Sequence, residues 1–217
     1  MIILALDTCV DACSVALWSD GQTLASLNEP MARGHQERLA PMVAEALAAA
    51  GLKPAALDRI AVTTGPGSFT GLRVGLAFAK GMALALDRPC IGVGTLEALA
   101  LGQDAAFVAA CLDARRGRVY LQAFVDGRAV MAPDILDIDE AAARLAELWT
   151  GGPARIVGSG APLVSGVLAS ASIDAAAVPE PAVLARLASA RTPGPMPRPL
   201  YLRAPDAKLP GGLSPNP

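Results

Sequence analysis

The chain has 217 residues, of which 53% are hydrophobic, so it can form one or two domains with a sizeable core. Its formal net charge is −2, with 18 basic and 20 acidic residues, and this balance argues against a protein that binds nucleic acid by itself. The single histidine, His35, cannot supply the three or four ligands of a typical metal site, so we expect no metal. The first residues lack a signal-peptide pattern, and the expected apolar helix at 72–86 is shorter than the roughly 20 residues that span a bilayer. These features predict a soluble, cytoplasmic protein with four reduced cysteines and no membrane segment.

Hydrophobic periodicity predicts a regular series of elements in the first half of the chain. The expected order is β-β-β-α-β-α-β-α, and Asp20-Gly21 is typical of a tight hairpin turn between the second and third strands. The expected elements are strands at 2–6, 13–19 and 23–27, a helix at 36–50, a strand at 60–64, a helix at 72–86, a strand at 90–93 and a short helix near 96–101.

The second half of the chain repeats the beginning of the first. With a shift of about 106 positions, Asp7 falls on Asp113, and the Asp-Gly turn at 20–21 falls on that at 126–127. A hairpin repeated with its turn in register indicates a duplicated β-β-β-α-β-α unit. The second copy has only alanine-rich helices near 139–148 and 181–190, so we expect it to be reduced.

Three regions follow from this pattern. The first domain is expected at 1–104 and the second, eroded one at 105–191. The remaining segment, 192–217, is rich in proline, which excludes a regular helix or a central strand. We expect an extended segment that ends in a disordered tip.

The loop TTGPGSFTGLR at 63–73 joins a predicted strand to the apolar helix. It is not a Walker P-loop, because Thr70 occupies the place of the second glycine and no lysine follows. It is not a nucleophile elbow, because Pro66 and Thr70 occupy the places of the glycines that would flank Ser68. Two interpretations stay open: a purely structural turn, and a glycine-rich helix start that holds an anion or admits another backbone.

The string GPGSFTGLR at 65–73 closely resembles the signature of the TsaB (YeaZ) family. Further segments resemble that family in the same order along nearly the whole chain, at 3–8, 13–17, 34–42, 79–81, 94–99, 113–120 and 199–203. The resemblance implies an α/β fold of the actin/Hsp70/sugar-kinase superfamily. It would have two tandem domains of the actin-like, RNase H-like type, the second reduced.

The resemblance also implies a function. A member of this family would be a non-catalytic scaffold or activator subunit of a complex that modifies tRNA. That complex transfers threonylcarbamoyl from threonylcarbamoyl-AMP to N6 of the adenosine 3′ to the anticodon. The implied partners are the catalytic paralogue TsaD, the small ATPase TsaE and a second copy of the chain when it is alone. The tRNA would be reached through the complex, with no cofactor of the chain's own and any nucleotide at a site shared with partners.

A small-molecule kinase of the same superfamily is the alternative. Asp7 and Asp113 stand where kinases of the superfamily carry a carboxylate, but the turn after Asp7 contains no glycine and the second domain is reduced. A peptidase, suggested by the glycoprotease-like label of this branch, lacks any Ser/His/Asp or metal constellation. We therefore expect no catalytic residues.

Two sets of site residues are expected. One could hold an anion or nucleotide, although Arg115 and its neighbours would equally suit a solvated β-turn; this set is Asp7, Thr8, Gly65, Gly67, Ser68, Asp113 and Arg115. The other is a partner interface on the two helices of the first domain, because the second helix is apolar nearly all round and small residues recur along it every four positions. This set is Leu39, Met42, Val43, Ala46, Gly71, Leu72, Arg73, Gly75, Leu76, Ala79 and Lys80, and the alternative is that the strip packs only within the domain.

Overall fold

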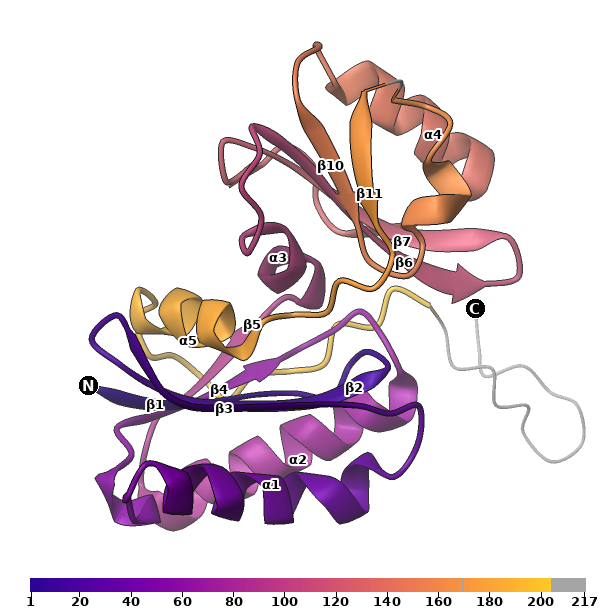
Figure 1. Ribbon diagram of the computed structural model, residues 1–217. Coiled ribbons are helices and arrows are strands. Elements are labelled where there is room, and N and C mark those ends of the chain that lie inside the picture. Colours follow the sequence, from indigo (N-terminus) through magenta and orange to yellow (C-terminus); the bar gives the residue numbers. More distant parts are fainter. Residues whose placement is uncertain (169, 204–217) are drawn as a thin grey trace, which may run out of the picture.

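Two β-sheets, each in its own lobe, organise the computed structural model, which describes residues 1–168 and 170–203 (Figure 1). The first sheet has the strand order β3-β2-β1-β4-β5. Its strands are β1 (Ile2–Asp7), β2 (Ala12–Ser19), β3 (Gln22–Pro30), β4 (Arg59–Thr63) and β5 (Cys90–Val93). The first three strands are antiparallel neighbours, whereas β4 and β5 run parallel to β1.

The second sheet repeats this topology. Its order is β11-β10-β6-β7-β8, with β9 also paired to β7. Its strands are β6 (Phe107–Arg115), β7 (Arg118–Val125), β8 (Arg128–Ala129), β9 (Asp134–Asp137), β10 (Ala154–Val157) and β11 (Ala171–Asp174). Again the hairpin is antiparallel and the last two strands are parallel to the first. The predicted duplication is therefore confirmed.

The repeated Asp-Gly turns explain why both hairpins form in the same register. Asp20 and Gly21 have φ angles of 48° and 91°, and Asp126 and Gly127 have 47° and 74°. Positive φ at both central residues matches the twist of the flanking strands, and aspartate followed by glycine tolerates it well. Local turn chemistry thus sets the start of each lobe.

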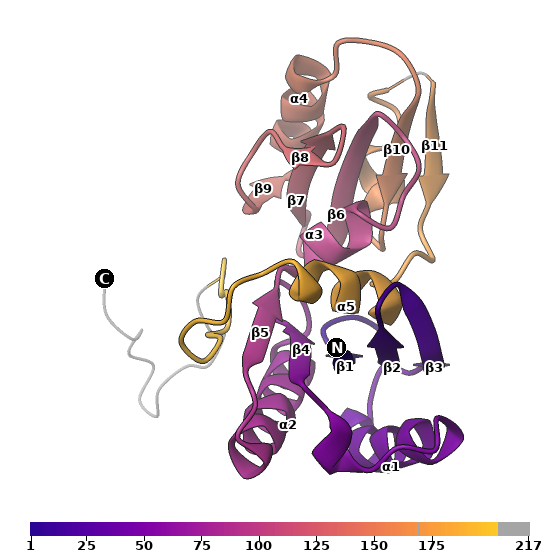
Figure 2. The same ribbon diagram turned by 90° about the vertical axis from the view of Figure 1, so that its left-hand side faces the viewer.

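The helices cover both faces of each sheet, and one helix of each lobe is exchanged. In the first lobe α1 (His35–Ala49) and α2 (Phe69–Leu86) cover one face, while α4 (Ile138–Leu148) and a 3-10 turn (Ala161–Val164) cover one face of the second sheet. The helix that follows each fifth strand crosses to the other lobe: α3 (Thr95–Ala100) packs on β6 and β7, and α5 (Pro181–Ser189) packs on β1 and β2. Figure 2 shows α3 and α5 lying between the two sheets.

The packing of α5 departs from the predicted assignment of 105–191 to the second domain. Strand β1 is buried on both faces: Leu4 and Leu6 face α1 and α2, and Ile3 and Ala5 face Leu184 of α5. A strand buried on both sides requires helices on both sides. The first half supplies helices for one side only, so α5 closes the other. The boundary at 104/105 itself stays a prediction.

Helix α2 is longer than predicted because it begins three residues earlier. Ser68 caps it, with its Oγ accepting a hydrogen bond from the Gly71 N–H at 3.3 Å. The resulting 18 residues are apolar enough, by length and composition alone, to cross a membrane. A core helix passes the same test, and α2 packs on β4 and α1 with 33% of this window buried.

Candidate functional site

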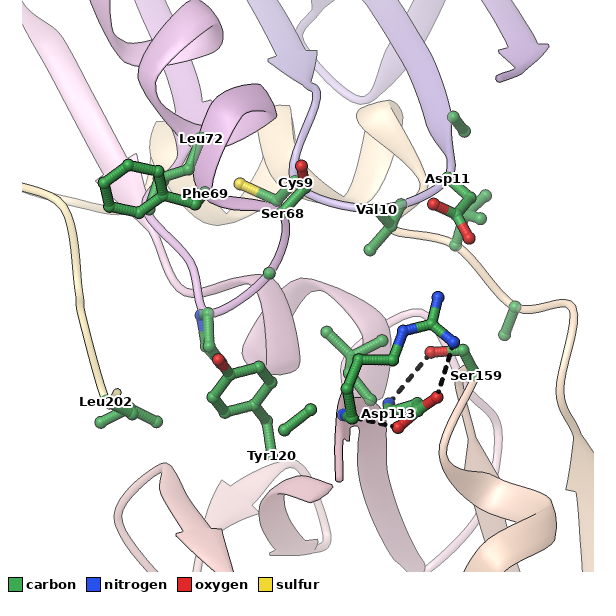
Figure 3. Close-up of a pocket in the computed structure, with 18 of the residues that line it drawn as sticks. Cys9, Val10, Asp11, Ser68, Phe69, Leu72, Asp113, Tyr120, Ser159 and Leu202 are labelled. Carbon is green, nitrogen blue, oxygen red and sulfur yellow. Dashed lines mark hydrogen bonds and ion pairs between the residues drawn. The ribbon is translucent and has the colours of Figure 1, made fainter. Parts of the chain in front are cut away.

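A cavity of about 1080 Å³ lies between the two lobes. The turn at 9–12 and the glycine loop at 66–69 form one wall, and the end of the β6–β7 hairpin forms the opposite wall. Figure 3 shows Cys9 and Ser68 on one side of this cleft, with Tyr120 and Asp113 on the other. Ligand pockets are most often concave, largely apolar and placed between domains, so this cleft is the candidate site.

Asp7 is sealed beneath the wall of the cleft. Its side chain is fully buried, and Oδ1 accepts hydrogen bonds from the Thr63 hydroxyl and from the Cys9 N–H at 3.1 Å. Oδ2 has no hydrogen-bond partner within the described residues. Burial raises the pKa of Asp7 to about 6, although its hydrogen bonds and the charge of His35 act in the opposite direction. The structure therefore does not bring the Asp7 carboxylate to the cavity surface.

The glycines of the loop allow it to pack directly on the β1–β2 turn. A Cβ added to Gly67 would lie less than 3.0 Å from the Cys9 carbonyl oxygen, and one added to Gly71 would lie equally close to the Thr8 carbonyl. The Ser68 N–H donates to the Cys9 carbonyl at 2.7 Å, and the Thr8 hydroxyl donates to the Gly71 carbonyl at 2.7 Å. The structure therefore shows that the glycines of this loop admit another part of the chain's own backbone, the β1–β2 turn. Neither Thr8 nor Gly65 lines the cavity.

Asp113, which is equivalent to Asp7 in the repeat, does line the cavity. Its Oδ1 accepts from the Arg115 N–H at 2.7 Å, and its Oδ2 lies 3.1 Å from the guanidinium of the same arginine. The Asp113 N–H donates to the Ser159 hydroxyl at 3.1 Å (Figure 3). The Asp113 carboxylate and the Arg115 guanidinium therefore form an ion pair at the end of the β6–β7 hairpin. The sequence did not predict a role for Ser159, because nothing in the pattern around this serine indicates that it contacts Asp113.

The C-terminal segment forms a side of the cleft that the sequence pattern did not predict. Residues 192–203 contain no regular helix or strand, as expected, and the predicted disordered tip lies outside the described residues. The Leu200 N–H donates to the Thr64 carbonyl at 2.8 Å, next to the glycine loop. Arg203 donates to the Ala114 carbonyl at 3.0 Å in the second lobe. This segment thus joins the two lobes at the cavity.

The Cys9 thiol and the His35 ring are both held inside the protein. Burial raises the pKa of the Cys9 thiol to about 12, which suppresses the reactive thiolate. Nε2 of the buried His35 lies 3.2 Å from the Ala12 carbonyl, so it must be the protonated nitrogen that donates. Within the described residues, no group of three or more His, Cys, Asp or Glu side chains could hold a metal ion.

Most residues of the predicted partner interface belong to the core of the first lobe, which corrects that prediction. The buried ones are Leu39, Met42, Val43, Ala46, Gly71, Leu72, Gly75, Leu76 and Ala79. The small residues of α2 do allow a close approach, but the neighbour is the β1–β2 turn, since Gly71 and Gly75 both face Thr8. Arg73 is exposed and Lys80 is half-buried. The outer face of α2 instead carries Ala77, Gly81, Leu84 and Ala85.

Comparisons with known proteins agree with this structure. The family model "TsaD: tRNA N6-adenosine threonylcarbamoyltransferase" matches residues 28–156. The TsaB protein of Escherichia coli, named as a tRNA threonylcarbamoyladenosine biosynthesis protein, is 45% identical over 124 residues. That match covers 55% of this chain and 53% of the relative, so the chain spans about half the length of this curated relative.

Two solved structures from Pseudomonas aeruginosa match most of the chain. The structure called YeaZ has a TM-score of 0.75 and 35% identity, and the match covers 87% of this chain and 90% of that one. The structure of an uncharacterized protein with similarity to peptidase YeaZ has a TM-score of 0.81 and 34% identity, with coverage of 93% and 99%. The chain therefore belongs to the TsaB (YeaZ) family.

Proposed function

We propose that this protein acts in tRNA threonylcarbamoyladenosine biosynthesis as a non-catalytic scaffold or activator subunit. Its complex would transfer threonylcarbamoyl from threonylcarbamoyl-AMP to N6 of the adenosine 3′ to the anticodon. The observation that carries the proposal is the sealed position of Asp7. A carboxylate that lies beneath the wall of the cleft is not placed to accept a proton from a substrate in it.

The second lobe supports the same proposal. Asp113 does face the cavity, but both of its oxygens are engaged with Arg115. Phosphate binding requires surplus positive charge or free backbone N–H groups. The Ser68 and Gly71 N–H groups of the glycine loop are already used within the protein. The cavity volume alone favours the alternative, a small-molecule kinase, because it is large enough for a nucleotide.

The proposed partner surface is the outer face of α2, in place of the buried residues first expected. Leu84 is 78% exposed there, and Ala77 and Ala85 are exposed beside it. An exposed apolar face on a two-lobed protein of this size is a natural contact for another chain. The expected occupant is the catalytic paralogue TsaD, with TsaE joining the complex and a second copy of this chain using the same face when it is alone.

The proposal places the reaction chemistry on the partners. The net charge of −2 supports tRNA binding through the complex rather than by this chain alone. We propose no cofactor of its own, and any nucleotide would lie at a site shared between subunits. Four buried free cysteines are consistent with a reducing compartment, where the tRNA substrate is also found, and we propose the cytoplasm.

The test is reconstitution with purified proteins. We expect formation of threonylcarbamoyladenosine in tRNA from threonylcarbamoyl-AMP when TsaD and this chain are combined, and none with this chain alone. Leu84→Glu should abolish the formation of threonylcarbamoyladenosine by the combined proteins. Leu24→Glu, at a residue exposed on β3 of the same lobe, should leave it unchanged. Phosphoryl transfer to a small metabolite by the pure protein, lost in Asp7→Ala, would replace this proposal with the kinase.

A further inference from the structure

The two exposed aromatic side chains of this chain contact one another, and both line the cleft. The chain has four phenylalanines, two tyrosines and two tryptophans, and all of them fall within the described residues. Among them only Phe69 and Tyr201 are exposed, each with 42% of its surface accessible. Their ring centroids are 5.4 Å apart. In a chain with so few aromatics, an exposed pair that comes from segments far apart in sequence calls for a functional explanation.

Arg73 is held against this pair. Its guanidinium carbon lies 3.9 Å from the centroid of the Phe69 ring and 5.9 Å from that of Tyr201. Its Nε donates a hydrogen bond to the Tyr201 hydroxyl at 3.0 Å. Phe69 and Arg73 lie four positions apart on α2, and the C-terminal segment brings Tyr201 to them. The cluster therefore fixes the direction in which the arginine points.

The guanidinium has donors left over. Arginine carries five N–H groups, and among the described residues only the one on Nε has a hydrogen-bond partner. Within residues 1–168 and 170–203, no carboxylate lies within 4.0 Å of Arg73. The two terminal nitrogens form a planar fork whose geometry matches a carboxylate. A pre-ordered arginine also loses less conformational freedom on binding than a mobile one.

We propose that Phe69, Arg73 and Tyr201 form an anchor that receives a carboxylate of the partner protein, at the N-terminal end of the α2 outer face. This inference rests on the proposed function, because the partner is taken to be the acyltransferase that docks on α2. The C-terminal segment takes part by supplying Tyr201, which orders Arg73 before the partner arrives. Arginine and aromatic side chains are enriched among the residues that dominate binding energy at protein interfaces.

The surroundings favour a protein carboxylate over RNA. An arginine beside aromatic rings could also stack on an unpaired base. RNA binding, however, needs several basic side chains along the backbone path. On the 18 residues of α2 the basic side chains are Arg73 and Lys80, and the exposed positions beyond Arg73 are Ala77, Gly81, Leu84 and Ala85. A mostly apolar face with one charged end fits a protein surface that carries a matching acid.

The experiment measures the affinity of the full chain for purified TsaD by calorimetry. We expect Arg73→Gln to raise Kd at least tenfold. Arg73→Lys should fail to restore binding, because lysine keeps the charge but has neither the planar fork nor the Nε donor for Tyr201. Tyr201→Phe, which removes one hydroxyl, should raise Kd about threefold. The control Arg128→Gln removes an equal charge from β8 of the second lobe and should leave Kd unchanged.

Several outcomes separate this inference from the proposed function. If the wild-type chain does not bind TsaD at all, the proposed function and the inference both fail. If wild type binds, Leu84→Glu does not, and the Arg73 and Tyr201 variants bind like wild type, the inference alone is overturned. If Arg73→Gln weakens tRNA binding by the complex while Kd for TsaD is unchanged, the anchor serves RNA and the carboxylate proposal is wrong. The proposal is supported if added salt raises the Kd of wild type for TsaD but leaves the Kd of Arg73→Gln unchanged.

Discussion

The two hairpin ends of the molecule begin from the same sequence pattern and end in different environments. In the first lobe the carboxylate of Asp7 is fully buried, and the glycine loop packs over it. In the second lobe the side chain of Asp113 keeps 25% of its surface accessible and pairs with Arg115 at the cavity. Position in a repeat therefore fixes where a residue lies along a strand, but the neighbouring loop decides whether it meets solvent.

The difference comes from the segments that follow β4 and β10. After β4, the loop at 64–68 leads into an 18-residue helix that lies directly on the β1–β2 turn. After β10, the equivalent segment is reduced to a 3-10 turn, Ala161–Val164, and leaves Asp113 beside the cavity. In the copy with the complete helix, the carboxylate is buried and does not reach the cavity. Of the two equivalent carboxylates, only that of Asp113 lines the cavity.

The strongest way to break the first-lobe arrangement is to add one methyl group at Gly71. A Cβ there would lie less than 3.0 Å from the Thr8 backbone carbonyl, which cannot move aside as a flexible side chain would. We expect Gly71→Ala to lower the free energy of unfolding by about 3 kcal/mol, measured by urea denaturation. Gly81→Ala on the same helix is the matched control, because its Cβ meets nothing within 4 Å. That change should stabilise the protein by roughly 0.5–1 kcal/mol, and equal losses from both variants would contradict the packing described.

The buried carboxylate gives a pH dependence that Asp7→Asn should remove. The folded pKa of Asp7, about 6, is above its ordinary value of 3.8, so folding favours the protonated form. This stabilisation is fully present below pH about 4 and is lost as the pH rises through about 6. At roughly 1.4 kcal/mol for each pKa unit, the loss amounts to about 2–3 kcal/mol.

The measurement is urea denaturation of both proteins at several pH values between 4 and 7. The asparagine variant should gain about 2–3 kcal/mol relative to wild type as the pH rises across this range. Titrations of other groups occur in both proteins and cancel in the difference. Two stability curves that stay parallel over the whole range would show that Asp7 is not held in a desolvated site.

The sequence predicts what local chemistry decides. The Asp-Gly turns specify both hairpins, and the spacing of Leu39, Met42 and Val43 specifies α1, so the duplicated fold could be predicted before the structure. The glycine spacing of α2 correctly indicates a close approach, but it does not identify the neighbour, which is Thr8 rather than another helix. Leu39 and its neighbours were predicted to face a partner but are buried in the core, because the apolar pattern does not say which surface covers it.

Non-local partners explain the parts of the site that could not be predicted. The exchange of α3 and α5 depends on which lobe lacks a cover for its sheet, and no short pattern encodes that choice. The segment at 199–203 resembles the family, yet its contacts with Thr64 and Ala114 lie far away in sequence. The role of Ser159 could not be predicted for the same reason, because its partner is the Asp113 N–H at the end of another strand.

The hydrogen bond of Ser159 offers a milder test of the second lobe. Ser159→Ala removes the hydroxyl that accepts from the Asp113 N–H, at a site where water can reach the freed group. We expect a loss of about 1 kcal/mol in the free energy of unfolding. Ser165→Ala, which removes a hydrogen bond to the Pro162 carbonyl on the surface of the same lobe, should cost less, about 0.5 kcal/mol or below. A loss above about 3 kcal/mol for Ser159→Ala would mean that this wall of the cleft is as tightly packed as the first.

The smallest effect is expected at the residue that the repeat makes equivalent to Asp7. Asp113→Asn keeps an oxygen for the Arg115 N–H and weakens an ion pair whose arginine side chain is 77% accessible to solvent. Exposed ion pairs contribute little, so the free energy of unfolding should fall by less than about 1 kcal/mol. A loss as large as that expected for Gly71→Ala would show that the Asp113 side chain is tightly packed, and the contrast between the two hairpin ends would not hold.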